Sequence, residues 1–181
     1  MTSQTRQRQV ASSSSESPPP TNPTMREPPA WMADGARRWL EDAGATVEGG
    51  PDRAFNALPL SGVRVSLAER GRAVCSLRVP AHLTQDAEGN WHKGAIAAAA
   101  DDVCAAAIMS VEGIIKVSVH YDITYFAPAK LHEEVELDGK VVEHKGRMTA
   151  VTVEIRKKES GELVAIGRQW MTASRHRGSK I

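Results

Sequence analysis

The chain has 181 residues with a formal net charge of +1, and 41% of its residues are hydrophobic. This length fits one domain with a tail, and the balanced charge argues against nucleic acid as a partner. Apart from one helix that two aspartates interrupt, no run of about 18 uncharged apolar residues occurs, so no membrane span is predicted. Cys75 and Cys104 lie in apolar contexts, which favours reduced core residues.

Residues 1–28 have the composition of a disordered tail, with Ser12–Ser15, Pro18–Pro20 and hardly an aliphatic residue. Such a segment buries too little surface to offset its ordering entropy. The first 15 residues carry Arg6 and Arg8 but no acid, which is also typical of an organelle transit peptide. We prefer a plain disordered extension and keep the transit peptide as the alternative.

Residues 29–60 are predicted to form an N-terminal helix and a connector. Pro28-Pro29 open a helix over about Ala30–Ala43, with Gly44 just past its end. Gly49-Gly50-Pro51 then breaks the chain. The next element is a hairpin between Val63 and Val79, in which apolar and polar residues alternate on the first strand.

The longest apolar run extends from Trp91 to Met109 and consists largely of alanine. Alanine is the strongest helix former, so we predict a helix over about His92–Ser110 that ends before Gly113. A helix that is apolar on nearly all sides is a buried one. Asp101 and Asp102 in its middle therefore need an explanation, because burying an unpaired carboxylate costs several kcal/mol, of order.

Four strand-like runs follow this helix, and short turn sequences separate them. Successive strands with short connections indicate an antiparallel sheet. One long buried helix beside such a sheet is an α+β architecture, and the alanine-rich helix predicts a sheet that curves around it. The domain spans 61–174, before a basic tail at 175–181. The four runs are 115–126, 133–143, 148–157 and 163–172.

An ordered set of short motifs lies between Gly62 and Ala173. The set resembles the hotdog-fold acyl-CoA thioesterases, in particular the group of mammalian thioesterase superfamily members, plant homologues and bacterial phenylacetate-degradation proteins. The resemblance implies a hotdog fold, hydrolysis of acyl-CoA, no cofactor beyond the coenzyme A of the substrate, and active sites shared across a dimer, usually within a tetramer. The motifs are Asp86, Gly89, His92-Lys93-Gly94, Asp101, Val117-Ser118-Val119, Tyr125–Lys130 and Gly167-Arg168.

Two positions depart from the family pattern. Lys93 stands where the family commonly has glycine, although any residue other than proline supplies the same backbone N–H. The family's asparagine aligns with Asp86 when the loop is counted back from His92. Counted from the other end of the loop, Thr84 or Gln85 fills that position.

Thioester hydrolysis needs hydrogen-bond donors for the carbonyl oxygen and a group that activates water. The amides of Lys93 and Gly94, at a helix N-terminus, are the candidate donors. Asp101 is the candidate base or nucleophile, and Ser118 is placed to hydrogen-bond it or its water. Asp101 follows His92 by nine residues, about 2.5 helical turns, and so faces the opposite side of the helix. We therefore expect Asp101 of one subunit to face the helix start of another, with His92 in a supporting role.

For coenzyme A, the resemblance points to Tyr125, Phe126, Ala127, Pro128, Ala129 and Lys130, and to the turn Lys145, Gly146 and Arg147. Their cations are placed to bind phosphates, with ordinary solvated surface charge as the alternative. For Asp102 we prefer a hydrogen bond to backbone at a subunit interface. No metal-ligand spacing occurs, so no metal is predicted.

Three questions stay open at this level. The substrate is a fatty acyl-CoA or, alternatively, an aromatic one such as a hydroxynaphthoyl or hydroxybenzoyl thioester. A non-catalytic protein that binds acyl-CoA, or a scaffold, is the alternative from another class. The last three residues, Ser179-Lys180-Ile181, differ from the peroxisomal address Ser-Lys-Leu by one aliphatic residue, so peroxisome and cytoplasm are both expected locations.

Overall fold

The computed structural model of the protein describes residues 28–45 and 57–173. Apart from Pro28, the predicted tails at 1–28 and 175–181 lie outside the described residues, as does the break at Gly49–Pro51. The helices and strands follow the predicted order. They are α1 (Ala30–Ala45), β1 (Arg64–Glu69), β2 (Arg72–Arg78), the 3-10 helix η1 (Ala81–Leu83), α3 (Lys93–Glu112), β3 (Val117–Tyr125), β4 (Glu134–Lys145), β5 (Met148–Lys157) and β6 (Leu163–Thr172).

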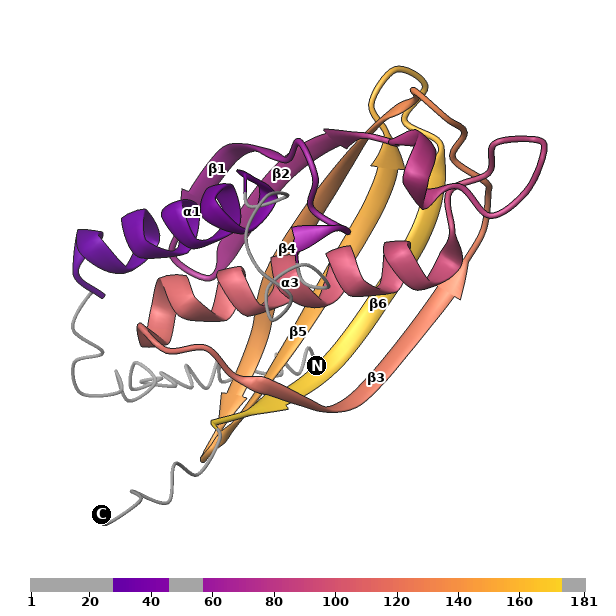
Figure 1. Cartoon of the computed structure of the whole chain (residues 1–181). Coiled ribbons are helices and arrows are strands. Elements are labelled where there is room, and N and C mark those ends of the chain that lie inside the picture. Colours follow the sequence, from indigo (N-terminus) through magenta and orange to yellow (C-terminus); the bar gives the residue numbers. More distant parts are fainter. Residues whose placement is uncertain (1–27, 46–56, 174–181) are drawn as a thin grey trace, which may run out of the picture.

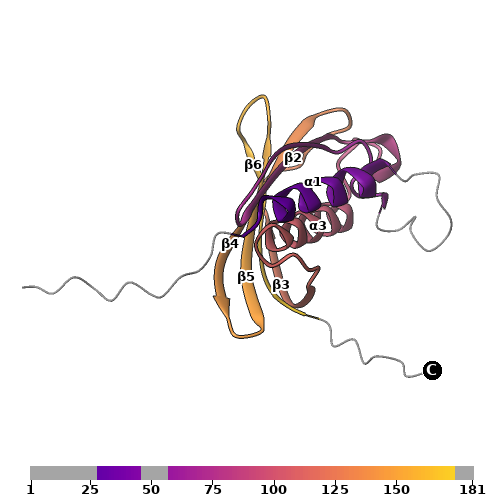
Figure 2. The same ribbon diagram turned by 90° about the vertical axis from the view of Figure 1, so that its left-hand side faces the viewer.

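The six strands form one antiparallel sheet in the order β1-β2-β4-β5-β6-β3. The sheet curves around α3, which lies in its concave face (Figures 1 and 2). Register shifts in β1, β3 and β4 contribute to the curvature, because a bulge bends a strand and increases its twist. The predicted α+β architecture is confirmed. β1 and β3 are the edge strands.

α3 is the centre of the core, and its small side chains allow the sheet to approach it closely. A Cβ added at Gly139 of β4 would lie only 3.0 Å from Val103 Cγ1 and from the Val103 carbonyl oxygen. Gly113 ends the helix in the left-handed conformation, with φ 69°, and its N–H donates to the Met109 carbonyl oxygen. By length and composition α3 could cross a membrane, but most of it is buried within the sheet.

α1 packs against α3 and β1 through Ala36, Leu40 and Gly44. The prediction that Gly44 follows the end of this helix was wrong. Gly44 lies inside the helix, where an added Cβ would approach Val63 Cγ1 and the Leu60 carbonyl oxygen closer than atoms can pack. Close approach of the connector, and not a helix stop, explains this glycine. Elsewhere in the core, Cys75 and Cys104 are free and fully buried, as predicted.

Candidate active site

The first turn of α3 is capped by the side chain of His92. Its Nδ1 accepts a hydrogen bond from the Gly94 N–H at 3.0 Å, and its backbone is extended, as an N-cap residue requires. A Cβ on Gly94 would lie 3.0 Å from two atoms of this imidazole, so glycine gives the ring its room. Both predicted oxyanion donors are already paired within the chain, because the Lys93 N–H likewise donates to Gln85 Oε1, so a substrate carbonyl must take the places of His92 and Gln85.

The loop before α3 distinguishes the three candidates for the family's asparagine position. The Asp86 carboxylate accepts from the backbone N–H and side-chain amide of Asn90, both at 3.0 Å, and these bonds lower the pKa of Asp86. The Thr84 hydroxyl donates to the Ala81 carbonyl oxygen at 2.9 Å. Gln85 Oε1 accepts from the Lys93 N–H at 3.4 Å. The structure thus brings Gln85 to the helix start, whereas the Asp86 carboxylate closes the loop through Asn90.

Asp101 and Ser118 lie together, as the sequence predicts. The Ser118 hydroxyl donates to Asp101 Oδ1 at 2.5 Å and lies 3.1 Å from the side-chain amide of Gln169, which is buried on β6. A hydroxyl has one proton, which Asp101 receives. Turning the Gln169 amide makes its nitrogen the donor to Ser118 Oγ, and this nitrogen otherwise has no partner. Ser118 and Gln169 together hold the carboxylate on the β3 side of α3.

Sequence reasoning missed two polar residues that support this region. Gln169 directly follows the Gly167-Arg168 motif, but its contact with Ser118 depends on the β3–β6 register. The Tyr121 hydroxyl donates to the Ala97 carbonyl oxygen at 2.9 Å and so braces α3 against β3, while burial raises the pKa of Tyr121. A single tyrosine two residues after the Val117-Ser118-Val119 motif gives no sequence signal of this contact.

Asp102 differs from its neighbour in environment. Burial, with the adjacent Asp101 charge acting in the same direction, raises the pKa of Asp102 to about 7. A carboxyl with such a pKa is partly protonated at neutral pH. This is the group that we predicted to hydrogen-bond at a subunit interface.

Asp101 and the helix start share one face of α3. Gly94 and Asp101 are seven residues apart, about two turns, so both lie on the same side of the helix but about 10 Å apart along its axis. Asp101 faces the side of the helix opposite to His92, which precedes the helix, but it faces the same side as Gly94. Within one chain, it is therefore the distance along the helix axis that keeps Asp101 from a carbonyl bound at the helix start.

The predicted coenzyme A segment from Tyr125 to Lys130 borders the helix start. The Tyr125 hydroxyl donates to the Lys93 carbonyl oxygen at 3.0 Å, and Lys93 Nζ lies 5.4 Å from the centre of the Tyr125 ring. Ala129 is buried and Lys130 is exposed. Beside them is a cavity of about 260 Å³ lined by Gln85, Asn90, Trp91, Lys93, Ile96, Tyr125, Phe126, Ala127 and Pro128.

The second predicted coenzyme A segment, the turn Lys145–Arg147, lies at the other end of α3. The Arg147 carbonyl oxygen accepts from Lys116 Nζ at 3.2 Å, and Lys116 in turn pairs with Glu112 of the last helical turn. In a single chain, therefore, the two segments that we expected to bind one coenzyme A flank opposite ends of the helix.

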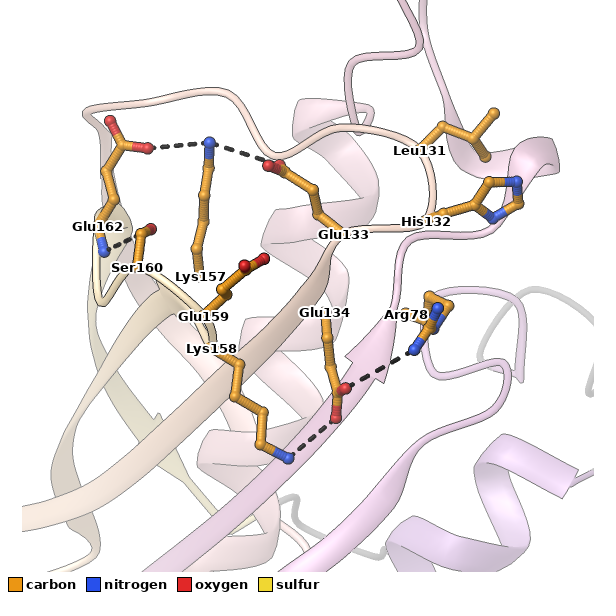
Figure 3. Close-up of a pocket in the computed structure, with 10 residues that line it drawn as sticks. All are labelled: Arg78, Leu131, His132, Glu133, Glu134, Lys157, Lys158, Glu159, Ser160 and Glu162. Atoms are coloured by element: carbon orange, nitrogen blue, oxygen red, sulfur yellow. Dashed lines mark hydrogen bonds and ion pairs between the residues drawn. The ribbon is translucent and has the colours of Figure 1, made fainter.

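A further cavity, of about 800 Å³, lies at the sheet end near the β5–β6 turn (Figure 3). Its cations are paired with its own carboxylates: Lys157 with Glu133 and Glu162 at 3.4 and 2.9 Å, and Lys158 with Glu134 at 2.9 Å. Such internal pairing leaves little charge for a ligand, so this cavity is not our candidate. Within residues 28–45 and 57–173, no three His, Cys, Asp or Glu side chains are grouped so that they could hold a metal ion.

Comparison with known proteins gives a consistent result. The Thioesterase superfamily model matches residues 88–164. Acyl-coenzyme A thioesterase 13 of Homo sapiens is 32% identical over 102 residues, which cover 56% of this chain and 72% of the relative. Zebrafish thioesterase superfamily member 2 superimposes with a TM-score of 0.68 at 26% identity, over 78% of this chain and 98% of that chain.

A hypothetical thioesterase of Streptococcus pneumoniae, solved with coenzyme A, has a TM-score of 0.61 and 21% identity, over 66% of this chain and 92% of that chain, and shows the same fold. These proteins are the hotdog-fold thioesterases that the motifs resemble. The chain belongs to the thioesterase superfamily.

Proposed function

We propose that this thioesterase hydrolyses acyl-CoA to a free acid and coenzyme A. The observation that carries the proposal is the pair formed by Asp101 and Ser118, at 2.5 Å on the face of α3 that also bears Gly94. The acyl-coenzyme A thioesterases among the relatives, and the coenzyme A bound to a structural neighbour, support the substrate class.

In the proposed reaction, the Asp101 carboxylate takes a proton from water as the water oxygen attacks the thioester carbon. The carbonyl oxygen becomes negative and accepts hydrogen bonds from the amides of Lys93 and Gly94, with Gln85 and His92 beside them. The carbon–sulfur bond then breaks, and the proton on Asp101 passes to the coenzyme A sulfur. Proton transfer by a positioned side chain typically contributes about 10²–10⁴ in rate.

We further propose that Asp101 of one subunit serves the helix start of another in a dimer, alone or within a tetramer. Three features support this assembly. The axial offset between Gly94 and Asp101 separates the donors from the base within one chain. The segment from Ile114 to Val119, which includes the first residues of the edge strand β3, has four exposed aliphatic side chains. The predicted coenzyme A segments lie at opposite ends of α3, so an antiparallel partner would bring them together.

The reaction is tested by measuring coenzyme A release with a free-thiol reagent from long-chain, short-chain and aromatic acyl-CoAs. We expect turnover by the natural protein and a loss of at least about a hundredfold in Asp101→Asn. The matched control is Asp122→Asn, the same change at an exposed position on β3, which should retain activity. Equal rates for Asp101→Asn and the natural protein would refute the assignment.

The same panel distinguishes the alternatives. Turnover of aromatic substrates alone would favour the hydroxynaphthoyl or hydroxybenzoyl class. Binding of acyl-CoA without release of coenzyme A would favour the scaffold reading.

The shared site is tested by subunit complementation. Gly94→Leu, which fills the space at the helix start, and Asp101→Asn should each inactivate a homodimer. A mixed dimer contains one site with both defects and one with neither. We therefore expect mixing to restore activity, whereas two inactive homodimers that stay inactive after verified exchange of subunits would contradict the shared site.

The location of the protein is also a proposal, because Ser179–Ile181 lie outside the described residues. We propose peroxisomal import through this C-terminal sequence, with the cytoplasm as the alternative. A fluorescent fusion that exposes the natural C-terminus, compared with one that lacks the last three residues, should differ in location.

A further inference from the structure

A second cavity, of about 280 Å³, lies beside the first turns of α3 on the side of the connector that precedes β1. Two leucines, a proline and two alanines contribute its apolar lining. Its polar side chains are already engaged in part: the Thr84 hydroxyl donates to a backbone oxygen, and His92 Nδ1 caps the helix. No carboxylate or ammonium of the same chain lines it. The full lining is Leu58, Pro59, His82, Leu83, Thr84, His92, Gly94, Ala95 and Ala98.

This cavity and the one beside Tyr125 flank the same helical turn. Gly94 lines the apolar cavity, whereas Lys93 and Ile96 line the other. A thioester bound at the amides of this turn has two arms that leave the carbonyl in different directions. The arm of coenzyme A carries amides and phosphates, which match a cavity with Gln85, Asn90 and Lys93. The acyl arm then lies on the side of Gly94.

We propose that the apolar cavity bounded by Leu58, Leu83, Ala95 and Ala98 binds the acyl group, and that its natural occupant is an uncharged aliphatic chain of medium length. This inference rests on the proposed function. Apolar lining without a fixed charge favours hydrocarbon over a carboxylated acyl group. At roughly 30 Å³ for each water-sized group in a liquid, the cavity has room for on the order of nine carbon-sized groups.

Ala98 is the residue that sets the depth of this cavity. It lies one turn beyond Gly94 on the same side of α3 and is half-buried, so a larger side chain there projects into the space and keeps the helix intact. Leu83, at the end of η1, provides the opposite change, because its truncation enlarges the cavity. Filling and enlarging the same space should move chain-length preference in opposite directions.

The experiment measures kcat/KM over a series of saturated acyl-CoAs from acetyl to palmitoyl. We expect a maximum at medium chain length in the natural protein. In Ala98→Leu the ratio of medium-chain to acetyl kcat/KM should fall by at least tenfold, since each methylene excluded from an apolar site costs about fourfold. In Leu83→Ala the maximum should move to longer chains.

Leu131→Ala is the matched control for Leu83→Ala, because Leu131 is also half-exposed but lines the separate cavity of Figure 3. It should keep the profile of the natural protein. Circular dichroism and size-exclusion chromatography show whether each variant folds and assembles, and Leu83→Ala decides the case if Ala98→Leu does not fold. An unchanged profile in a folded, active variant overturns the inference and leaves the proposed function intact. Absence of coenzyme A release by the natural protein overturns both.

Discussion

The Gly94 amide donates to His92 Nδ1 at 3.0 Å, so the donor that we assign to the reacting carbonyl is held by the chain's own imidazole. The contact satisfies a helix N–H that would otherwise have no partner within the helix. It also keeps the amide directed out of the helix start, where the substrate must arrive. His92 thereby combines two roles, cap in the free protein and neighbour of the thioester in the complex.

His92→Ala should lower the free energy of unfolding by about 1 kcal/mol, because it removes a side-chain cap. His92→Asn should preserve most of the stability, since asparagine is among the best N-cap residues. Denaturant unfolding at one fixed protein concentration measures both variants, because the stability of an oligomer depends on concentration. Equal loss of stability in both variants would show that the cap contributes little.

Ser118→Ala should lower kcat by about tenfold to a hundredfold and change KM little, because hydrogen bonds to charged groups contribute about 1.5–3 kcal/mol. Ser118 acts through Asp101 and is therefore a positioning residue. Ser118→Thr keeps the hydroxyl and should recover part of kcat. Ser66→Ala, which removes a hydroxyl that donates to the Val74 carbonyl oxygen on the far edge of the sheet, is the control. A change confined to KM would contradict the positioning role.

Much of the fold could be predicted from the sequence, because local residue patterns indicate where its helices, strands and turns lie. The alanine content of α3 and the glycine after it define the helix, and turn residues separate the strands of the sheet. The position of Gly44 inside α1 could not be predicted in this way. A glycine at a helix end and a glycine under a crossing segment look alike in sequence, and only the packing of Val63 and Leu60 against it tells them apart.

The candidate site could be predicted from the sequence only in part. The pairing of Asp101 with Ser118 was predicted, but the contribution of Gln169 required knowledge of which strand lies beside β3. Likewise, Gln85 and Asp86 are adjacent in sequence, and the loop geometry sends one to the helix start and the other to Asn90. Strand order and loop closure are tertiary properties, so residue spacing could not decide either case.

Asp102→Asn should stabilise the protein at pH 8 more than at pH 5. The folded pKa of Asp102, about 7, lies above its unfolded value, so the folded state binds the proton more tightly and stability falls as pH rises from about 4 to 7. Asparagine is neutral throughout and removes this decline. At 1.36 kcal/mol per pKa unit, the charged carboxylate lowers the free energy of unfolding by at most about 4 kcal/mol. At this half-buried position we expect about 1–2 kcal/mol.

The measurement for Asp102 is the thermal midpoint of both proteins between pH 5 and pH 8. Asp122→Asn, at an exposed position, serves as the control and should not alter the pH dependence. A difference between Asp102→Asn and the natural protein that stays constant across this range would mean that Asp102 does not titrate there.

His132→Gly should raise the free energy of unfolding by about 0.5–1 kcal/mol. His132 has φ 68° and is the only non-glycine residue with positive φ among residues 28–45 and 57–173. The left-handed conformation costs an L-residue about 1–2 kcal/mol, which glycine avoids. The greater chain entropy of glycine in the unfolded state offsets part of this stabilisation. The N–H of residue 132, which donates to the Val79 carbonyl oxygen at 2.9 Å, is kept in the variant, so the turn keeps its backbone hydrogen bond.

His120→Gly makes the same substitution in the extended strand β3, where glycine should destabilise. Denaturant unfolding of the two variants should therefore give changes of opposite sign, and equal losses would mean that the imidazole of His132, at the edge of the cavity in Figure 3, contributes more than its backbone strain costs.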